Sequence, residues 1–167
     1  MKELVIGAGN SKTKNIYVED NKYKNPVYLD IDEASNPDVI WDLNVRPLPF
    51  EDEEFDEIHA YEVLEHIGKQ GDWKSFFEEW NEYYRILKPK GKFYGTCPST
   101  FSPWCWGDPG HTRVINDCTI TFLLRSAYQD QVGVTAMTDY RSVYQGDFKA
   151  LHLNDDKETF FFVLEKI

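Results

Sequence analysis

The segment Leu4-Val5-Ile6-Gly7-Ala8-Gly9-Asn10 sets the expectations for the whole chain. Its apolar residues are typical of a buried strand, and the Gly-Ala-Gly-Asn that follows is typical of a tight turn. Two glycines this close together indicate backbone in unusual dihedral angles, or backbone that a ligand approaches closely. Ligands of open α/β sheets bind just beyond the carboxyl ends of the strands, so the turn Gly7–Asn10 is predicted to form part of a small-molecule site.

The composition of the 167-residue chain fits one domain with its own core, since 41% of the residues are hydrophobic and 16% are aromatic. No apolar run is long enough to span a bilayer, and the amino-terminal residues do not resemble a signal peptide. Cys97, Cys105 and Cys118 are odd in number and irregularly spaced, which predicts reduced thiols in a cytoplasmic protein. Together with His111 they match no zinc motif, so no metal site is expected.

The chain is strongly acidic, with a formal net charge of -11. From Asp30 to His66 it carries thirteen acidic residues and one basic residue, Arg46. A surface of this charge repels phosphate backbones and anionic membranes. Nucleic acid is therefore an unlikely partner, and no membrane association is expected.

Strand-like and helix-like segments alternate, which predicts an α/β fold with a parallel sheet. The connection Asn10–Asn25 is polar and is expected to hold at most a short helix. Asp72 is typical of an N-cap for a helix over 73–87, and Asn116 is typical of one for a helix to about 128. The strands are expected at 3–7, 27–32, 39–43, 55–61, 92–97, 132–143 and 159–164.

Asp30 lies about twenty positions after the glycine turn, at the end of the second predicted strand. This spacing is typical of a carboxylate that binds the ribose hydroxyls of a nucleotide. An aspartate at a strand end can equally cap the next turn, and position alone does not separate the two roles. A dinucleotide fingerprint is excluded, because its third glycine would fall at Lys12.

Five blocks follow one another in a recognisable order: Val-Ile-Gly-Ala-Gly-Asn at 5–10, Leu-Asp-Ile-Asp at 29–32, Trp-Asp-Leu-Asn at 41–44, Phe-Asp-Glu-Ile…Val-Leu-Glu-His-Ile at 55–67 and Arg-Ile-Leu-Lys-Pro-Lys-Gly at 85–91. From about Leu4 to Thr112 the chain resembles the class I S-adenosylmethionine-dependent methyltransferases, in particular small members with GCGN-like and VLEH motifs. The resemblance implies one methyltransferase-like domain over 1–167. It also implies a Rossmann-like α/β fold with a mostly parallel sheet and an antiparallel last strand.

The resemblance also implies roles for individual residues, with S-adenosyl-L-methionine as the cofactor. Asp30 would hold the ribose hydroxyls, and Ile31 would lie against the adenine. Two positions depart from the family pattern and bear on cofactor affinity: Val5, where an acidic residue is common, and Ser11, where a third glycine is common. The other implied cofactor contacts are Ile6, Gly7, Ala8, Gly9 and Asn10 around the methionine part, Asp42 and Leu43 near the adenine amino group, and Tyr61 and Glu62 near the sulfonium.

The segment at about 98–115 is irregular and rich in tryptophan, proline and glycine, and in this fold it would lie over the methyl-transfer site as a lid-like loop. Trp104 and Trp106 would form its walls. His111 would act as a base or orienting group, with Asp108 as its partner. The alternative is a structural loop in which His111 is satisfied by a backbone group.

The predicted function is transfer of a methyl group from S-adenosylmethionine to a small-molecule or glycan-type acceptor. Tyr61 is placed beside His111 and Asp108 among the candidate catalytic residues, since a sulfonium needs orientation and an anionic or aromatic surround more than acid–base help. Two alternatives are a degenerate methyltransferase fold that serves as a cofactor-binding or regulatory module, and an enzyme that consumes the cofactor without an acceptor. The sequence makes no prediction of oligomeric state.

Overall fold

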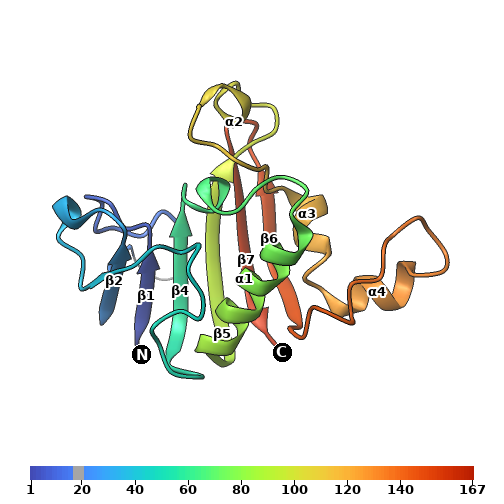
Figure 1. Ribbon diagram of the computed structural model, residues 1–167, viewed down its shortest axis with the longest axis horizontal. Coiled ribbons are helices and arrows are strands. Elements are labelled where there is room, and N and C mark those ends of the chain that lie inside the picture. The colour runs from blue at the N-terminus through green and yellow to red at the C-terminus, as the bar shows by residue number, and fades with distance from the viewer. Residues whose placement is uncertain (17–20) are drawn as a thin grey trace.

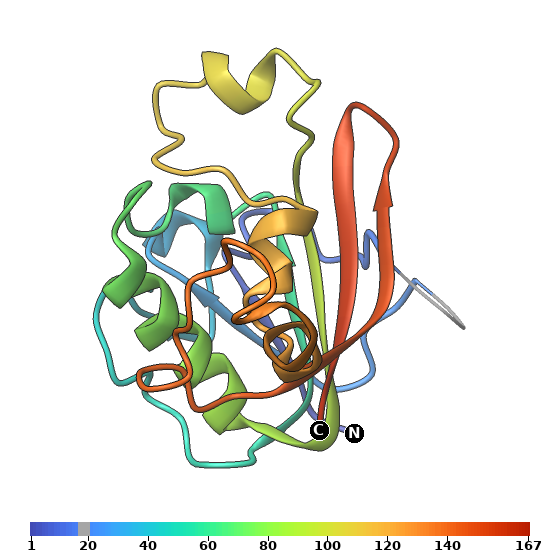
Figure 2. The same cartoon turned by 90° about the vertical axis from the view of Figure 1, so that its right-hand side faces the viewer.

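The computed structural model describes residues 1–16 and 21–167, which form a sheet with helices packed against one face (Figures 1 and 2). Seven strands lie in the order β3-β2-β1-β4-β5-β7-β6. Their bounds are β1 Glu3–Ile6, β2 Pro26–Asp30, β3 Val39–Ile40, β4 Phe55–Tyr61, β5 Leu87–Pro98, β6 Phe148–Asp155 and β7 Thr159–Lys166.

The first five strands are parallel to one another, and β7 runs antiparallel between β5 and β6. This confirms the expected α/β architecture with a mostly parallel sheet and an antiparallel last strand. Because the strand order reverses direction at β1, the carboxyl ends of β1 and β4 lie side by side there, which is where open sheets of this kind bind ligands (Figure 1).

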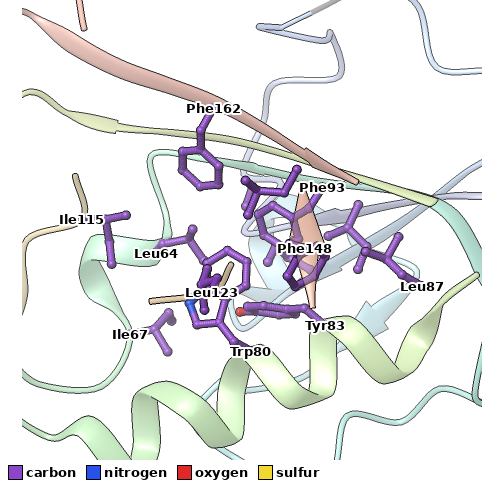
Figure 3. Close-up of a cluster of buried hydrophobic side chains, with 14 of the residues drawn as sticks. Leu64, Ile67, Trp80, Tyr83, Leu87, Phe93, Ile115, Leu123, Phe148 and Phe162 are labelled. Carbon is purple, nitrogen blue, oxygen red and sulfur yellow. The ribbon is translucent and has the colours of Figure 1, made fainter. Parts of the chain in front are cut away.

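The core forms between the sheet and helix α1, which spans Trp73–Ile86. Asp72 caps this helix by accepting a hydrogen bond from the Ser75 backbone N–H, as predicted. The apolar stripe of α1 packs Trp80 and Tyr83 against aromatic rings of β5, β6 and β7 (Figure 3). The helix therefore holds the parallel strands and the final hairpin in one core.

The predicted strand over 132–143 is wrong. This region consists of turns and a single bridge, and the sixth strand is β6 at Phe148–Asp155 instead. Gly133 has a φ of 80°, and Val134 is 80% exposed, so neither continues an extended buried strand. β6 lies at the sheet edge, where most of its residues are exposed, and the register shift between Ala150 and His152 interrupts the alternation of its apolar residues.

The helix predicted from Asn116 to about 128 is divided in two. Asn116 does cap a helix, α3 over Asp117–Thr121, in a capping box with Thr119. The backbone then turns, and α4 follows over Arg125–Gln131. The interruption places Leu123 in the core, where its carbonyl accepts a hydrogen bond from the Phe148 N–H. Pairing with the start of β6 thus competes with helix continuation.

Smaller differences concern strand lengths. The third strand is only Val39–Ile40, and β5 begins five residues before the predicted range of 92–97. Residues 17–20 of the connection between β1 and β2 lie outside the described residues, and the described remainder of that connection forms no helix. In the part of the chain that the structure covers, no helix has the length and apolar character to cross a membrane.

Candidate cofactor and acceptor site

The carboxyl ends of the parallel strands bring the predicted cofactor residues to one edge of the sheet (Figure 1). The turn Gly7–Asn10 follows β1, Asp30 ends β2, and Asp42 follows β3. The 98–115 segment rises above this edge from the end of β5 and contains the short helix α2, Trp104–Gly107 (Figure 2). The sheet therefore presents a glycine turn, two carboxylates and an overhanging loop on the same side.

Both glycines of the turn adopt left-handed backbone, with φ of 60° at Gly7 and 49° at Gly9. At Gly7 the space is also closed, because a β-carbon there would lie 2.3 Å from the Val63 Cγ2 atom. At Gly9 nothing lies within 4 Å of such an atom. Gly7 thus lets the turn pack on the end of β4, and Gly9 leaves an open surface at which a ligand can approach the backbone.

Asp30 organises this turn from the neighbouring strand. It is 8% exposed, and its two carboxylate oxygens accept hydrogen bonds from the Gly9 N–H at 2.8 Å and the Asp32 N–H at 2.9 Å. Asp30 therefore has the turn-capping role that its position allowed. Each carboxylate oxygen has more than one lone pair, so the capping bonds leave acceptor capacity for ribose hydroxyls.

The remaining predicted cofactor residues surround Asp30. Ile31 is 65% exposed, although it directly follows a buried strand end. Asp42 accepts hydrogen bonds from the backbone and side-chain nitrogens of Asn44, and Leu43 beside it is buried. The exposed apolar side chain of Ile31 and the carboxylate of Asp42 are suitable partners for the face and the polar edge of an adenine ring.

Val5 is 3% exposed and lies in register with Tyr28 on β2 and His59 on β4. Its side chain is buried against the sheet and has no polar group that could bind a ligand. Ser11, the other departure from the family pattern, is exposed beyond the turn. The amino group of a cofactor would therefore need partners other than the residue at position 5.

A cavity of about 360 Å³ lies beside the end of β4, beneath the 98–115 segment. Glu62, directly after β4, is one of the residues that line this cavity. Its backbone lies in the left-handed region, at a φ of 52°, and its N–H donates a hydrogen bond to the Thr96 carbonyl. Backbone strain of this kind costs of order 1–3 kcal/mol and is found mainly at functional sites. The lining residues are Glu62, Glu65, His66, Pro98, Ser102, Trp104, Asp108, His111, Glu158 and Thr159.

The structure brings His111 and Asp108 together in this cavity, but not in hydrogen-bond contact. The His111 Nε2 atom lies 3.8 Å from Asp108 Oδ2 and 4.0 Å from Glu65 Oε1. The His111 Nδ1 atom is buried and has no hydrogen-bond partner among the described residues, so the backbone contact that a structural role would supply is absent there. Trp104 lines the cavity, whereas Trp106 donates its indole N–H to the Thr100 carbonyl and is not part of the lining.

Glu65 was not singled out as a functional residue by the sequence, although it lies within the Val-Leu-Glu-His block. It is 2% exposed, and in the described structure neither carboxylate oxygen has a hydrogen-bond partner. Burial raises its pKa to about 7. The sequence offers one local signal, the adjacent His66; His111 approaches Glu65 only in the folded chain.

Tyr61 lies apart from His111, on the opposite face of the sheet. Its hydroxyl lies 2.8 Å from the His59 Nδ1 atom and 3.2 Å from the Ile16 carbonyl oxygen. His59 is fully buried, stacks on Tyr94 and contacts the Glu57 carboxylate through Nε2 at 3.1 Å. This polar network faces the connection between β1 and β2, so Tyr61 lies toward that connection and is not part of the lining of the cavity at His111.

The network predicts a stability that falls with acidification. Burial lowers the pKa of His59 below 6.5, so its contribution is complete above pH 6.5 and is lost as the pH falls through the folded-state value. Burial alone would raise the pKa of Glu57, but hydrogen bonds from His59 and Lys14 lower it from 4.5 to about 2, so its contribution is lost below pH 4.5. Urea denaturation at pH 7.5 and pH 5.5 should show the His59 effect.

The stability advantage of the parent protein over His59→Gln should therefore shrink when the pH falls from 7.5 to 5.5. Glu65, whose raised pKa acts in the opposite direction over this range, is present in both proteins and cancels in the comparison. The control His152→Gln, at an exposed histidine on β6, should retain the slope of the parent protein. An unchanged slope in His59→Gln would contradict the assignment of the pH dependence to His59.

A seven-stranded sheet of this order, with a glycine turn after β1 and an acidic residue at the end of β2, defines a class I, Rossmann-like methyltransferase fold. Residues 4–95 match the family model described as a methyltransferase domain. The chain therefore belongs to this methyltransferase family. The match ends before the 98–115 segment, so His111 and Asp108 lie outside it.

Comparison with curated proteins gives a relative from Mycolicibacterium smegmatis described as a probable S-adenosylmethionine-dependent methyltransferase. The two sequences are 33% identical over an alignment of 121 positions, and the alignment covers 64% of this chain and 45% of the relative. The aligned part of this chain thus spans less than half the length of that relative.

Solved structures show the same fold at low sequence identity. A SAM-dependent methyltransferase from Archaeoglobus fulgidus superposes with a TM-score of 0.62 at 13% identity, covering 99% of this chain and 86% of that one. The N-methyltransferase NodS from Bradyrhizobium japonicum, in complex with S-adenosyl-L-homocysteine, gives a TM-score of 0.56 at 10% identity, covering 99% and 77%.

Proposed function

We propose that this protein binds S-adenosyl-L-methionine at the carboxyl edge of β1, β2 and β3 and transfers its methyl group to an acceptor in the cavity beneath the 98–115 segment. The observation that carries the proposal is the pairing of Asp30 with the open glycine turn. The Asp30 carboxylate accepts a hydrogen bond from the Gly9 N–H, and no atom lies within 4 Å of the position that a β-carbon would take at Gly9. Ribose hydroxyls and the methionine part of the cofactor can therefore be held by adjacent groups.

The roles of the individual residues follow from their positions. Ile31 and Asp42 receive the adenine, and Tyr61 borders the cofactor from β4. Glu62, at the tip of β4, separates the cofactor from the cavity, so the sulfonium would lie beside its carboxylate. His111 is proposed to orient the nucleophilic atom of the acceptor, with Asp108 on the same side of the ring. Holding the nucleophile in line with the methyl group accounts for most of the catalysis that such a transfer needs.

The acceptor is proposed to be a small molecule or glycan that carries hydroxyl or amino groups and no phosphate. The cavity wall contains the carboxylates of Glu62, Asp108 and Glu158, which would repel an anionic acceptor. Trp104, at 67% exposure, offers a flat apolar surface to a ring. Carboxylates with an exposed indole suit a polar, hydroxyl-rich molecule.

We place this reaction in the cytoplasm. The support is that Cys97, Cys105 and Cys118 are all free thiols, two of them buried, and none is positioned as half of a disulfide. Free thiols of this kind are kept by proteins of reducing compartments.

Replacing Asp30 by alanine tests the cofactor site. Titration calorimetry with S-adenosyl-L-homocysteine should show saturable 1:1 binding to the parent protein and a roughly 10- to 100-fold weaker affinity for the variant. The reason is that hydrogen bonds to a charged group contribute about 1.5–3 kcal/mol. The expectation fails if the parent shows no binding at millimolar ligand, or if both proteins bind equally.

The neighbouring carboxylate provides the control. Asp32 is exposed and caps the short turn at Glu33–Ser35. The variant Asp32→Ala should therefore keep the affinity of the parent to within a few-fold. Circular dichroism of both variants shows whether the loss in Asp30→Ala comes from the binding contact or from a disordered turn. A screen of hydroxyl- and amine-bearing acceptors with labelled cofactor then identifies the acceptor class.

A further inference from the structure

The deep wall of the acceptor cavity contains a carboxylate with no cationic partner. Glu65 is 2% exposed and lines the cavity, and neither of its oxygens accepts a hydrogen bond from a nitrogen or hydroxyl group in the described structure. The thiol of Cys97, on β5, lies beside this carboxylate. A buried carboxylate of this kind is costly unless a cation or a donor satisfies it. No lysine or arginine forms an ion pair with Glu65 among the described residues.

Two histidines face this carboxylate. His66 and His111 pack edge to face with ring centroids 4.7 Å apart, and one ligand atom from each of Glu65, His66 and His111 lies within 4.8 Å of the others. The His66 Nδ1 atom lies 3.0 Å from the Gly110 carbonyl oxygen, so Nδ1 carries the proton and Nε2 keeps its lone pair. A hydrogen bond from the second ring nitrogen to a carbonyl is the usual support of a metal-ligating histidine.

A comparable trio on the other face of the sheet shows the difference. Glu3, Glu57 and His59 also lie within 4.8 Å of one another. There the chain supplies its own cation, because the Lys14 Nζ atom lies 2.7 Å from Glu3 and 2.9 Å from Glu57. The trio in the acceptor cavity has the same acid and imidazole chemistry and lacks the built-in cation.

We propose that Glu65, His66 and His111 bind a divalent first-row transition-metal ion, such as Zn²⁺ or Mn²⁺, within the acceptor cavity. Two imidazoles and one carboxylate form a ligand set that suits these ions. The three ligand atoms lie within 4.8 Å of one another, and ligand distances of about 2.0–2.2 Å require the side chains to close around the ion. Asp108 Oδ2, 3.8 Å from His111 Nε2, provides a fourth ligand. The absence of a zinc motif among the three cysteines and His111 does not bear on this site, because Glu65 and His66 are not part of that set.

The open side of this site faces the cavity. A role for the ion in holding an acceptor oxygen rests on the proposed methyl transfer, since the ion would then orient that oxygen toward the methyl group. Binding of the ion itself does not depend on the cofactor, because none of its ligands belongs to the glycine turn or to Asp30. The two proposals can therefore be tested separately on the same protein.

The test uses the full chain, without a histidine tag and stripped of metal with a chelator. Calorimetric titration with Zn²⁺ should show one saturable site per chain, and Co²⁺ should give visible d–d absorption bands at the same stoichiometry. The variants Glu65→Gln and His111→Ala should each weaken Zn²⁺ binding at least tenfold and abolish the Co²⁺ bands. All of these variants carry Cys118→Ser as well, because the exposed Cys118 thiol could bind the metal ion itself.

Matched controls separate a built site from surface binding. The variants His152→Ala, at an exposed histidine of β6, and Glu158→Gln, at another carboxylate of the cavity, should bind Zn²⁺ as the background does. The metal proposal is overturned if the background protein binds no ion at millimolar concentration, or if Glu65→Gln binds as tightly as the background. Binding of S-adenosyl-L-homocysteine in the same samples shows whether the cofactor proposal stands when the metal proposal fails.

Discussion

Replacing Arg113 by methionine is expected to lower the free energy of unfolding by about 3–5 kcal/mol, because it removes the nearer cation from a buried carboxylate. The second cation, Arg46, lies 3.6 Å from Glu79 Oε2 and remains. Arg113 is 6% exposed and Glu79, on α1, is 1% exposed. The guanidinium nitrogens lie 2.8 Å and 2.7 Å from the two Glu79 oxygens, and Nε donates to the Leu64 carbonyl at 2.8 Å. Urea denaturation followed by circular dichroism measures the loss.

The same contact ties the end of the 98–115 segment to the core. Arg113 joins that segment to α1 through Glu79 and to the turn after β4 through Leu64. The variant should therefore also raise the sensitivity of the segment to limited proteolysis, before global unfolding. Loss of stability without this local effect would show that the segment is held elsewhere.

Two controls test the cause. Arg141→Met removes an arginine that forms an ion pair with Asp139. The Arg141 side chain is 40% exposed and the Asp139 side chain is 42% exposed. Ion pairs as exposed as this one contribute little to stability, so this variant should stay near the parent. The double variant Arg113→Met/Glu79→Leu should recover a large part of the loss, because it removes the uncompensated charge. Equal losses in Arg113→Met and Arg141→Met would contradict the argument from burial.

Replacing Gly7 by alanine is expected to be the most damaging change in the cofactor turn. Left-handed backbone at a residue other than glycine costs about 1–3 kcal/mol. The added β-carbon would also overlap Val63, whose Cγ2 atom lies 2.3 Å from its position, and overpacking costs typically about 1–3 kcal/mol. We expect a loss of roughly 2–5 kcal/mol in unfolding free energy and a loss of S-adenosyl-L-homocysteine binding in calorimetry.

Gly9 separates the strain from the steric overlap. Its φ of 49° gives Gly9→Ala the same kind of backbone strain, but no atom lies within 4 Å of the added carbon. This variant should unfold with a smaller loss than Gly7→Ala. The double variant Gly7→Ala/Val63→Ala should regain only the unfolding free energy that Gly7→Ala loses through overlap with Val63, and not the part lost through backbone strain. If Gly9→Ala were as destabilised as Gly7→Ala, contact with Val63 would not be the reason.

The part of the fold that could be predicted is the part in which local sequence and burial agree. Leu4-Val5-Ile6 is apolar because β1 is buried between β2 and β4, and Asp72 and Asn116 are caps whose side chains bond within three residues. β6 could not be predicted, because its residues face solvent at the sheet edge and it forms by pairing with β7. Its hydrogen bonds depend on a partner strand, and the bulge between Ala150 and His152 interrupts the alternation of its apolar residues.

The candidate site shows the same division. Asp30 could be singled out from its distance along the chain from the glycine turn, and the structure shows its contact with that turn. Glu65 is not, because its significance comes from what is missing around it: two buried oxygens without partners. The contact between Arg113 and Glu79 joins residues 34 positions apart, and no local pattern connects them. Contacts of that kind become visible only when the chain is folded.

The two outer strands of the sheet have a consequence for the behaviour of the protein at high concentration. An edge strand offers unpaired backbone groups to another chain and so favours aggregation. One edge, β3, is only two residues long, and the other, β6, has an irregular register between Ala150 and His152 and carries Lys149. Short length, a bulge and a charge are all features that prevent a second sheet from adding on, so the open sheet is protected against edge-to-edge association at both ends.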